Sequence, residues 1–126
     1  MIYGIGTDVV EVSRIKLALK KHGQKLAEKI LTAHELLAYK DVKSKENFLA
    51  KRFAAKEAFA KAFGTGLRGD VNLKSIEVIH DDLGKPLLKY HDKLKVLVQE
   101  KNIHRCHLSI SDEKNIAVAF VILETQ

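Results

Sequence analysis

The chain opens on an apolar run, residues 1–7, that two glycines interrupt, and this pattern predicts an initial β-strand. Asp8 falls at the end of that strand, a place where polypeptides commonly present side chains to a site. Apolar and polar positions then repeat with helical spacing through a lysine-rich segment. Ser13 is the expected N-cap of this basic helix, and Gly23 fits its C-terminal end.

Capping residues mark three further helices. We expect a short helix at about residues 25–30. Thr32, followed three residues later by Glu35, has the pattern of a capping box that opens the next helix. Ser44 is expected to cap a long central helix at about residues 45–63, which the following glycine ends. After its initial strand, the first half of the chain is therefore predicted to be helical.

Beyond residue 66 the pattern changes to the alternation and turn residues of β-strands. We expect strands at about 73–80 and 87–90 joined by a turn at 81–86, then a helix at 92–101 and two final strands at 105–111 and 116–123. His107, Ser109 and Ser111 alternate with apolar residues, so one face of their strand should be polar. This order predicts an α+β fold: N-terminal helices and a long central helix packed on a small antiparallel sheet, forming one domain over residues 1–126.

The central helix has no broad polar face. At 100° per residue its large apolar side chains cover nearly half of the helical wheel, and alanines fill most of the rest. These large residues are Phe48, Leu49, Phe53, Phe59 and Phe63. Such a helix is expected to be buried on most sides.

Charged residues nevertheless lie among these apolar positions. Arg52 and Lys56 project within the aromatic arc, whereas Glu57 and Lys61 share a second sector with alanines. Buried charges are costly unless they are paired or bound to a metal or ligand. The simple alternative is a Glu57–Lys61 surface pair, which would contribute only about 0.2–0.5 kcal/mol.

Composition and charge narrow the class of protein. The 126 residues are 46% hydrophobic and 30% charged, without an apolar run long enough to span a membrane and without the basic flank of a signal peptide. A lone cysteine, Cys106, argues against a disulfide framework and for the cytoplasm. The first 66 residues hold 13 Lys/Arg against 7 Asp/Glu, and the remainder holds 9 of each. This asymmetry indicates an anionic partner (phosphates, nucleic acid or an acidic protein) or simply a solvated lysine-rich surface.

Asp8 and Glu57 are the candidate residues for chemistry. If the fold brings them together with Lys61 nearby, they provide what a Mg²⁺–phosphate site needs, because Mg²⁺ takes one or two protein carboxylates and completes its shell with water and phosphate oxygens. A lysine one turn away could offset the charge that develops on a phosphoryl oxygen. The six histidines lack the spacing of zinc sites, and neither a P-loop nor a nucleophile elbow is present.

Three segments in order resemble a known family. GIGTDVVEVSRI (residues 4–15), RFAAKEAFAKAFGTG (52–66) and HLSISD (107–112), together with GKP at 84–86, are similar to motifs of holo-[acyl-carrier-protein] synthase, the short bacterial type of 4′-phosphopantetheinyl transferase. The resemblance spans essentially the whole chain. It implies Mg²⁺-dependent transfer of the 4′-phosphopantetheine arm of coenzyme A to a serine of apo acyl carrier protein, with release of adenosine 3′,5′-bisphosphate, in support of fatty acid biosynthesis.

The resemblance also implies roles for individual residues. Asp8 and Glu57 would be the Mg²⁺ ligands, Lys61 would balance phosphate charge, and Glu57 or a metal-held water would take the serine proton. The expected coenzyme A contacts are Arg52, Lys56, Lys61, Gly64, Gly66, Gly84, Lys85, Pro86 and His107. The expected carrier-protein contacts are Arg14, Lys16, Lys20 and Lys21. The family assembles as a trimer with sites at subunit boundaries, so Arg52 and Lys56 could face a subunit seam.

Two other functions stay open on the residues alone. The +6 net charge fits a nucleic-acid-binding module, although the aromatic residues are expected in the core and no recognised motif is present, so we expect no nucleic-acid partner. A carrier-protein-binding subunit without catalysis would keep the basic first helix and would not need Glu57.

Overall fold

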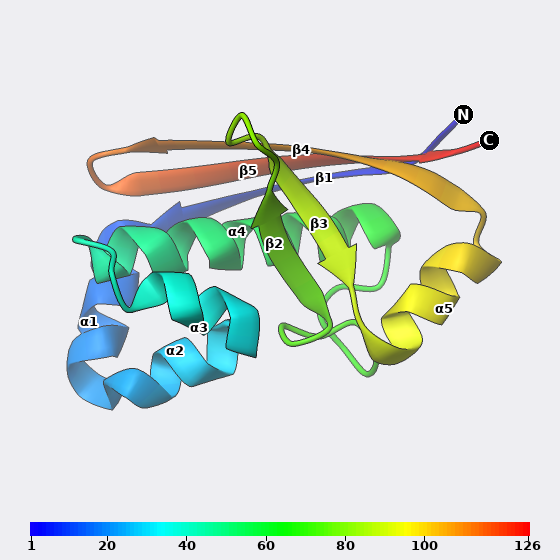
Figure 1. Cartoon of the computed structure of the whole chain (residues 1–126). Helices are drawn as coiled ribbons and strands as arrows, with labels where there is room; N and C mark the ends of the chain where they lie inside the picture. Colours follow the sequence, from blue (N-terminus) through cyan, green and yellow to red (C-terminus); the bar gives the residue numbers. More distant parts are fainter.

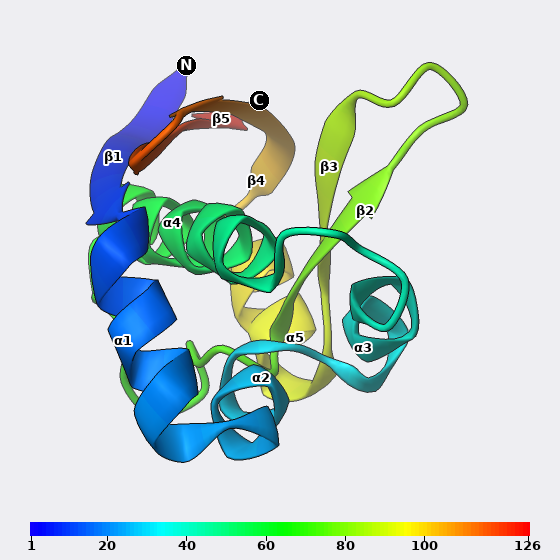
Figure 2. The same ribbon diagram turned by 90° about the vertical axis from the view of Figure 1, so that its left-hand side faces the viewer.

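A three-stranded antiparallel sheet curves over one long central helix (Figure 1, Figure 2). In the computed structural model, which describes residues 1–126, β1 (Ile2–Glu11), β5 (Ile116–Thr125) and β4 (Ile103–Glu113) form this sheet in the order β1-β5-β4. The helix α4 (Lys45–Phe63) lies against the inner face of the sheet. The predicted α+β fold is confirmed.

The other elements surround α4 on the sides that the sheet leaves open. They are α1 (Val12–His22), α2 (Gln24–Ile30), α3 (Ala33–Tyr39), β2 (Ile76–His80), β3 (Pro86–Tyr90) and α5 (Asp92–Glu100). Strands β2 and β3 form a separate antiparallel hairpin whose turn projects from the body, on the other side of α4 from β1 (Figure 2). None of the helices combines the length and the apolarity needed to cross a membrane.

Helix α4 is buried on most sides, as its apolar pattern predicts. Twelve of its 19 residues are buried, among them Leu49 and Phe59, which are fully inaccessible. Ser44 accepts a hydrogen bond from the backbone of Asn47 at the start, and Gly64, in the left-handed conformation, ends the helix. Both predicted ends of α4 are therefore confirmed.

Two glycines let β1 lie directly on the backbone of α4. A Cβ atom at Gly6 would stand 2.0 Å from the carbonyl oxygen of Ala58 and 2.6 Å from the nitrogen of Ala62. At Gly4 it would stand 2.0 Å from the carbonyl oxygen of Ala62. No larger side chain fits at either position, because the neighbouring atoms belong to the backbone. This close approach fixes how β1 runs along α4.

Two predicted features near the N-terminus are wrong. Strand β1 continues to Glu11, so Asp8 lies inside the strand, opposite Ala119 of β5, and not at its end. Ser13 is not an N-cap, because α1 begins directly after the strand and its first amides bond to Asn115 in the β4–β5 turn. That contact joins positions a hundred residues apart, which local capping patterns do not reveal. The capping box of Thr32 and Glu35 and the glycine end of α1 are confirmed.

The outer face of the three-stranded sheet is uncovered, and its β1 and β5 part exposes large apolar side chains. Residues that alternate with the buried positions of β1 and β5 point away from α4, and several are highly exposed: Ile5 at 60%, Val9 at 61%, and Ile116 and Phe120 at 42% each. No element of the chain packs over this face (Figure 1, Figure 2).

Candidate functional site

Asp8, Glu57 and Lys61 line one open hollow of about 660 Å³ between β1, α4 and the start of α1. Asp8 follows Gly6 on the same side of β1, the side that lies on α4. Because Gly6 sits over Ala58, the strand carries Asp8 to the part of α4 that presents Glu57 and Lys61. The sequence predicts a site only if the fold brings these three residues together, and the structure shows that it does. We refer to this space as the Asp8–Glu57 hollow.

Lys61 pairs with β1 and not with Glu57. Its ammonium lies 3.1 Å from a carboxylate oxygen of Asp8 and donates to the carbonyl oxygen of Thr7 at 3.0 Å. No ion pair joins Glu57 and Lys61, so the alternative of a simple surface pair one turn apart does not describe this helix. Half of the Lys61 side chain remains exposed, which leaves the ammonium accessible to an anion in the hollow.

The surroundings of Glu57 in the hollow raise the pKa of its carboxylate. Burial raises the pKa of Glu57, the nearby Asp8 carboxylate raises it further, and Lys61 partly opposes both effects. Two carboxylates that face one space in this way favour a bound cation. The chain has no cluster of three or more His, Cys, Asp or Glu side chains able to enclose a metal. A cation here would keep positions for water and phosphate oxygens, as Mg²⁺ does.

An apolar wall and one arginine complete the hollow. Ile15 and Phe53 line it beside Arg14, whose side chain is 81% exposed and lies 3.8 Å from Glu11. An exposed pair of this length contributes little to stability, on the order of 0–1 kcal/mol, so Arg14 is free to meet another anion. The structure thus places Arg14, expected from the sequence only as a carrier-protein contact, at the edge of the same hollow as Glu57.

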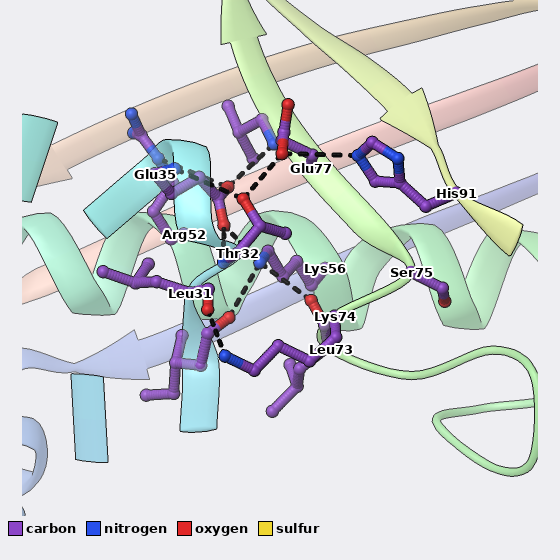
Figure 3. A network of polar contacts seen from close by, with 12 residues as sticks. Leu31, Thr32, Glu35, Arg52, Lys56, Leu73, Lys74, Ser75, Glu77 and His91 are labelled. Atoms are coloured by element: carbon purple, nitrogen blue, oxygen red, sulfur yellow. Dashed lines mark hydrogen bonds and ion pairs between the residues drawn. The ribbon is translucent and has the colours of Figure 1, made fainter. Parts of the chain in front are cut away.

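Arg52 and Lys56 do not reach this hollow. Lys56 is fully buried, and its ammonium donates to Glu35 at 2.6 Å and to the carbonyl oxygens of Ile30 at 2.7 Å and Leu73 at 2.9 Å (Figure 3). Arg52 stacks on Phe48 and lies 3.7 Å from Glu35. The Lys56 ammonium has no face left for a phosphate or a subunit seam, so we withdraw Lys56 from the phosphate-binding set.

Glu35 is the residue that sequence reasoning missed in this region. One of its carboxylate oxygens accepts from Lys56 and from the backbone of Thr32, and the other accepts from the backbone of Val78. The capping-box pattern identified Glu35 only as a local helix start. Its position 21 residues before Lys56 gave no signal that the two charges pair.

The expected coenzyme A contacts at Gly64 and in the 84–86 turn do not line the Asp8–Glu57 hollow. Gly64 sits at the end of α4, and Gly84 with Lys85 forms the turn between β2 and β3, where Asp81 accepts hydrogen bonds from the backbone. Pro86 opposes His80 at the start of β3. The hairpin turn and β1 lie on opposite sides of α4 (Figure 2), so one chain does not gather all the expected nucleotide contacts.

His107 lies on the outer, uncovered face of the sheet, as the alternation of β4 predicts. Its ring lies 2.5 Å from the carboxylate of Glu124 on the neighbouring strand β5. The hydrogen bond from His107 lowers the pKa of Glu124. His107 is half exposed and does not line the Asp8–Glu57 hollow.

The basic residues of α1 are exposed and follow Arg14, which lines the hollow. Lys16, Lys20 and Lys21 follow Arg14 along the helix, and Leu17 between them is 68% exposed. A cationic helix that also presents a large apolar side chain suits an acidic amphipathic partner. The prediction of a basic helical surface is confirmed.

The whole chain matches one protein family. The sequence profile of the 4′-phosphopantetheinyl transferase superfamily matches residues 4–121. The holo-[acyl-carrier-protein] synthase of Nitrosospira multiformis is 59% identical over 124 residues, which is 98% of this chain and 99% of that protein.

Solved structures show the same architecture. The crystal structure of the holo-[acyl-carrier-protein] synthase of Neisseria meningitidis superposes with a TM-score of 0.96 at 51% identity, covering 99% of this chain and 100% of that one. The Bacillus anthracis holo-(acyl-carrier-protein) synthase in complex with CoA (3′,5′-ADP) superposes with a TM-score of 0.85 at 43% identity, covering 100% of this chain and 99% of that one.

Proposed function

The chain belongs to the 4′-phosphopantetheinyl transferase superfamily, and we propose that it moves the 4′-phosphopantetheine arm of coenzyme A onto a serine of apo acyl carrier protein. The observation that carries this proposal is the meeting of Asp8, Glu57 and Lys61 in one hollow. A holo-carrier protein is what fatty acid synthesis requires, and we place the protein in that process, in the cytoplasm.

The reaction forms one oxygen–phosphorus bond and breaks another. The serine hydroxyl of the carrier attacks the phosphorus that bears the pantetheine arm, and the bond from this phosphorus to the bridging oxygen of the pyrophosphate breaks. Adenosine 3′,5′-bisphosphate leaves with that oxygen, and the serine proton passes to Glu57 or to water. The raised pKa of Glu57 makes its carboxylate a better proton acceptor than an ordinary glutamate. Lys61 offsets negative charge on the phosphates.

Asp8 and Glu57 would hold Mg²⁺ in the hollow. Two carboxylates from one chain leave room for pyrophosphate oxygens and water, which is the ligand set this ion prefers. When bound, the ion supplies charge stabilisation for the pyrophosphate oxygens.

The remaining nucleotide contacts would come from a neighbouring copy of the chain. Arg52, the 84–86 turn and His107 lie away from the Asp8–Glu57 hollow, so a nucleotide anchored there needs them from a second subunit. The exposed apolar residues of β1 and β5 on the outer face of the sheet offer the surface for such an assembly, because contiguous apolar patches usually mark an interface. We propose a trimer whose sites lie between subunits.

Phe120→Glu tests this assembly. Placing a charge on the outer face of β5 is expected to lower the molecular mass in solution from that of three chains towards one, because an unpaired charge is costly in an interface. Light scattering coupled to gel filtration measures the mass. Val96→Glu, which changes an exposed apolar residue of α5, is the matched control. If the Phe120 variant keeps the wild-type mass of an assembly, this face is not the interface.

Arg14→Ala is expected to raise the KM for carrier protein several-fold, by about 3–10-fold, with a smaller change in the KM for coenzyme A. Charges at the rim of an interface act mainly on encounter and docking. Steady-state kinetics with each substrate varied in turn measures both constants. Lys95→Ala, on α5, is the control. An equal rise in both constants would place Arg14 in the nucleotide site instead.

The proposed function itself is tested by weighing the carrier. The protein is incubated with apo acyl carrier protein, coenzyme A and Mg²⁺, and the intact carrier is analysed by mass spectrometry. A gain equal to one phosphopantetheine supports the proposal, and an unchanged carrier mass refutes it.

A further inference from the structure

We propose that Lys56 is a positioning residue: its buried ion pair with Glu35 sets the rotation of α4 about its axis and thereby aims Glu57 at Asp8. This inference rests on the proposed function of the Asp8–Glu57 hollow. It assigns a role to a charge cluster that does not line the hollow, on a side of α4 about 100° from Glu57.

Lys56 is bonded to three separate segments. Its ammonium donates to the carbonyl oxygen of Ile30 at the end of α2, to Glu35 on α3 and to the carbonyl oxygen of Leu73 in the loop before β2 (Figure 3). All three donor hydrogens of the ammonium are used. A side chain with three directed bonds in three directions permits little rotation of the helix that carries it.

Glu35 is held just as firmly. Besides Lys56 it accepts hydrogen bonds from the backbone of Thr32 at 2.9 Å and of Val78 at 2.8 Å. Thr32 in turn donates to Glu77 at 2.6 Å, and the ring of His91 lies 3.3 Å from the same oxygen of Glu77 (Figure 3). The hydrogen-bond network that begins at Lys56 therefore runs through α3 and β2 to His91, directly after β3.

The opposite side of α4 is fixed by β1. Successive residues of a helix project about 100° apart, so Ala58 points roughly 200° from Lys56, and Glu57 lies between them. Ala58 is the residue whose carbonyl lies under Gly6. Two sets of contacts on nearly opposite sides of α4, the Lys56 hydrogen bonds and the Gly6 contact, therefore fix its rotation. Glu57 projects between them, so these contacts determine the direction of its side chain.

Stability alone does not account for these charges. Buried ion pairs can often be replaced by apolar residues of similar volume without loss of stability, because removing two charges from water is costly. What the pair supplies and apolar packing does not is directional bonds that accept one rotation of the helix. A site made of two carboxylates on different elements needs that constraint, because metal ligands must lie within a few tenths of an ångström of their places.

The test compares Lys56→Met with the double variant Glu35→Gln/Lys56→Met. The single variant removes the closer of the two cations beside the buried Glu35 carboxylate and leaves only Arg52, at 3.7 Å, so it is the more prone to unfold. In the double variant glutamine can still accept one backbone hydrogen bond. Lys51→Met, a lysine of the same helix outside the network, is the matched control. Circular dichroism and thermal melting establish which variants are folded at the assay temperature.

Direct Mn²⁺ binding, followed by electron paramagnetic resonance on the protein alone, is the deciding measurement. We expect the folded double variant to bind Mn²⁺ at least about tenfold more weakly and to show a similar rise in the KM for Mg²⁺, with the KM for carrier protein unchanged. Lys51→Met should match the wild type. A folded double variant with wild-type Mn²⁺ affinity and only a lower Tm would overturn the inference and leave Lys56 a stabilising residue.

The wild-type chain provides a second measurement if both variants fail to fold. Coupling between two sites is reciprocal, so a cation in the hollow must stabilise the Glu35–Lys56 arrangement. Hydrogen exchange at the Thr32 and Val78 amides, which bond to Glu35, is expected to slow on addition of Mn²⁺ more than exchange in α5 does. Equal exchange with and without the ion would overturn the inference. If the wild type binds Mn²⁺ yet transfers no phosphopantetheine, the proposed function fails and the positioning role is judged on binding alone.

Discussion

Glu57→Gln is expected to lower kcat/KM for phosphopantetheine transfer by about 10²–10³-fold, the loss typical of removing one charge-stabilising group from an active site. Glutamine keeps the length and shape of the side chain, but it removes the negative oxygen that a hard cation requires and the group able to accept a proton. Asp8→Asn removes the second carboxylate of the same hollow, and a loss of similar size is expected. Steady-state transfer at ordinary Mg²⁺ concentration measures both.

A control variant and a binding measurement show whether the loss of transfer is specific to Glu57. Glu46→Gln, at the start of the same helix, changes an acid outside the hollow and should leave transfer intact. Carrier-protein binding should survive Glu57→Gln, because the proposed docking surface is on α1. Wild-type turnover by Glu57→Gln would refute the assignment of Glu57 as ligand and proton acceptor.

Gly6→Ala is expected to lower the free energy of unfolding by about 1–3 kcal/mol and to remove most transfer activity. The added methyl would stand 2.0 Å from the carbonyl oxygen of Ala58, an overlap that only a shift of β1 or α4 can relieve. Because Asp8 belongs to the same strand, that shift also separates Asp8 from Glu57. Urea unfolding measures the stability, and transfer assays on the folded fraction measure the activity.

Gly69→Ala is the matched control for this substitution. Unlike Gly6, Gly69 lies in a left-handed backbone conformation that favours glycine, at φ +56, and an added Cβ there would meet no atom within 4 Å. It should cost only the conformational strain, on the order of 1 kcal/mol, without affecting the hollow. If Gly6→Ala is no more harmful than Gly69→Ala, the close packing of β1 on α4 does not position the site.

The local elements of the fold could be predicted from the sequence, because their signals lie within a few residues of one another. The caps at Thr32 and Ser44, the glycine ends of α1 and α4 and the apolar wheel of α4 are of this kind. The start of α1 could not be predicted. Its first amides bond to Asn115, and nothing near Ser13 in the sequence indicates that partner.

The site was predictable in its residue types and not in its geometry. The carboxylates of Asp8 and Glu57 suit a magnesium–phosphate site by their chemistry, but their meeting depends on a strand-to-helix contact that only the folded chain provides. The charges on α4 show the same limit. Periodicity identified Arg52 and Lys56 as charges in a buried arc, whereas the partner that makes this possible, Glu35, belongs to another helix. The sequence therefore places Lys56 with the ligand, whereas in the structure its ammonium bonds to Glu35 and to the carbonyl oxygens of Ile30 and Leu73.

A crystal of the protein grown with coenzyme A and Mn²⁺ tests the central claim most directly. Mn²⁺ favours the same oxygen ligands as Mg²⁺ and can be located by its anomalous scattering. The account predicts an anomalous peak at about 2.0–2.3 Å from carboxylate oxygens of both Asp8 and Glu57 of one chain, with pyrophosphate oxygens completing its shell and the nucleotide lying against the 84–86 turn of a neighbouring chain. A peak that touches neither carboxylate, with the pyrophosphate bound outside the Asp8–Glu57 hollow, would contradict it.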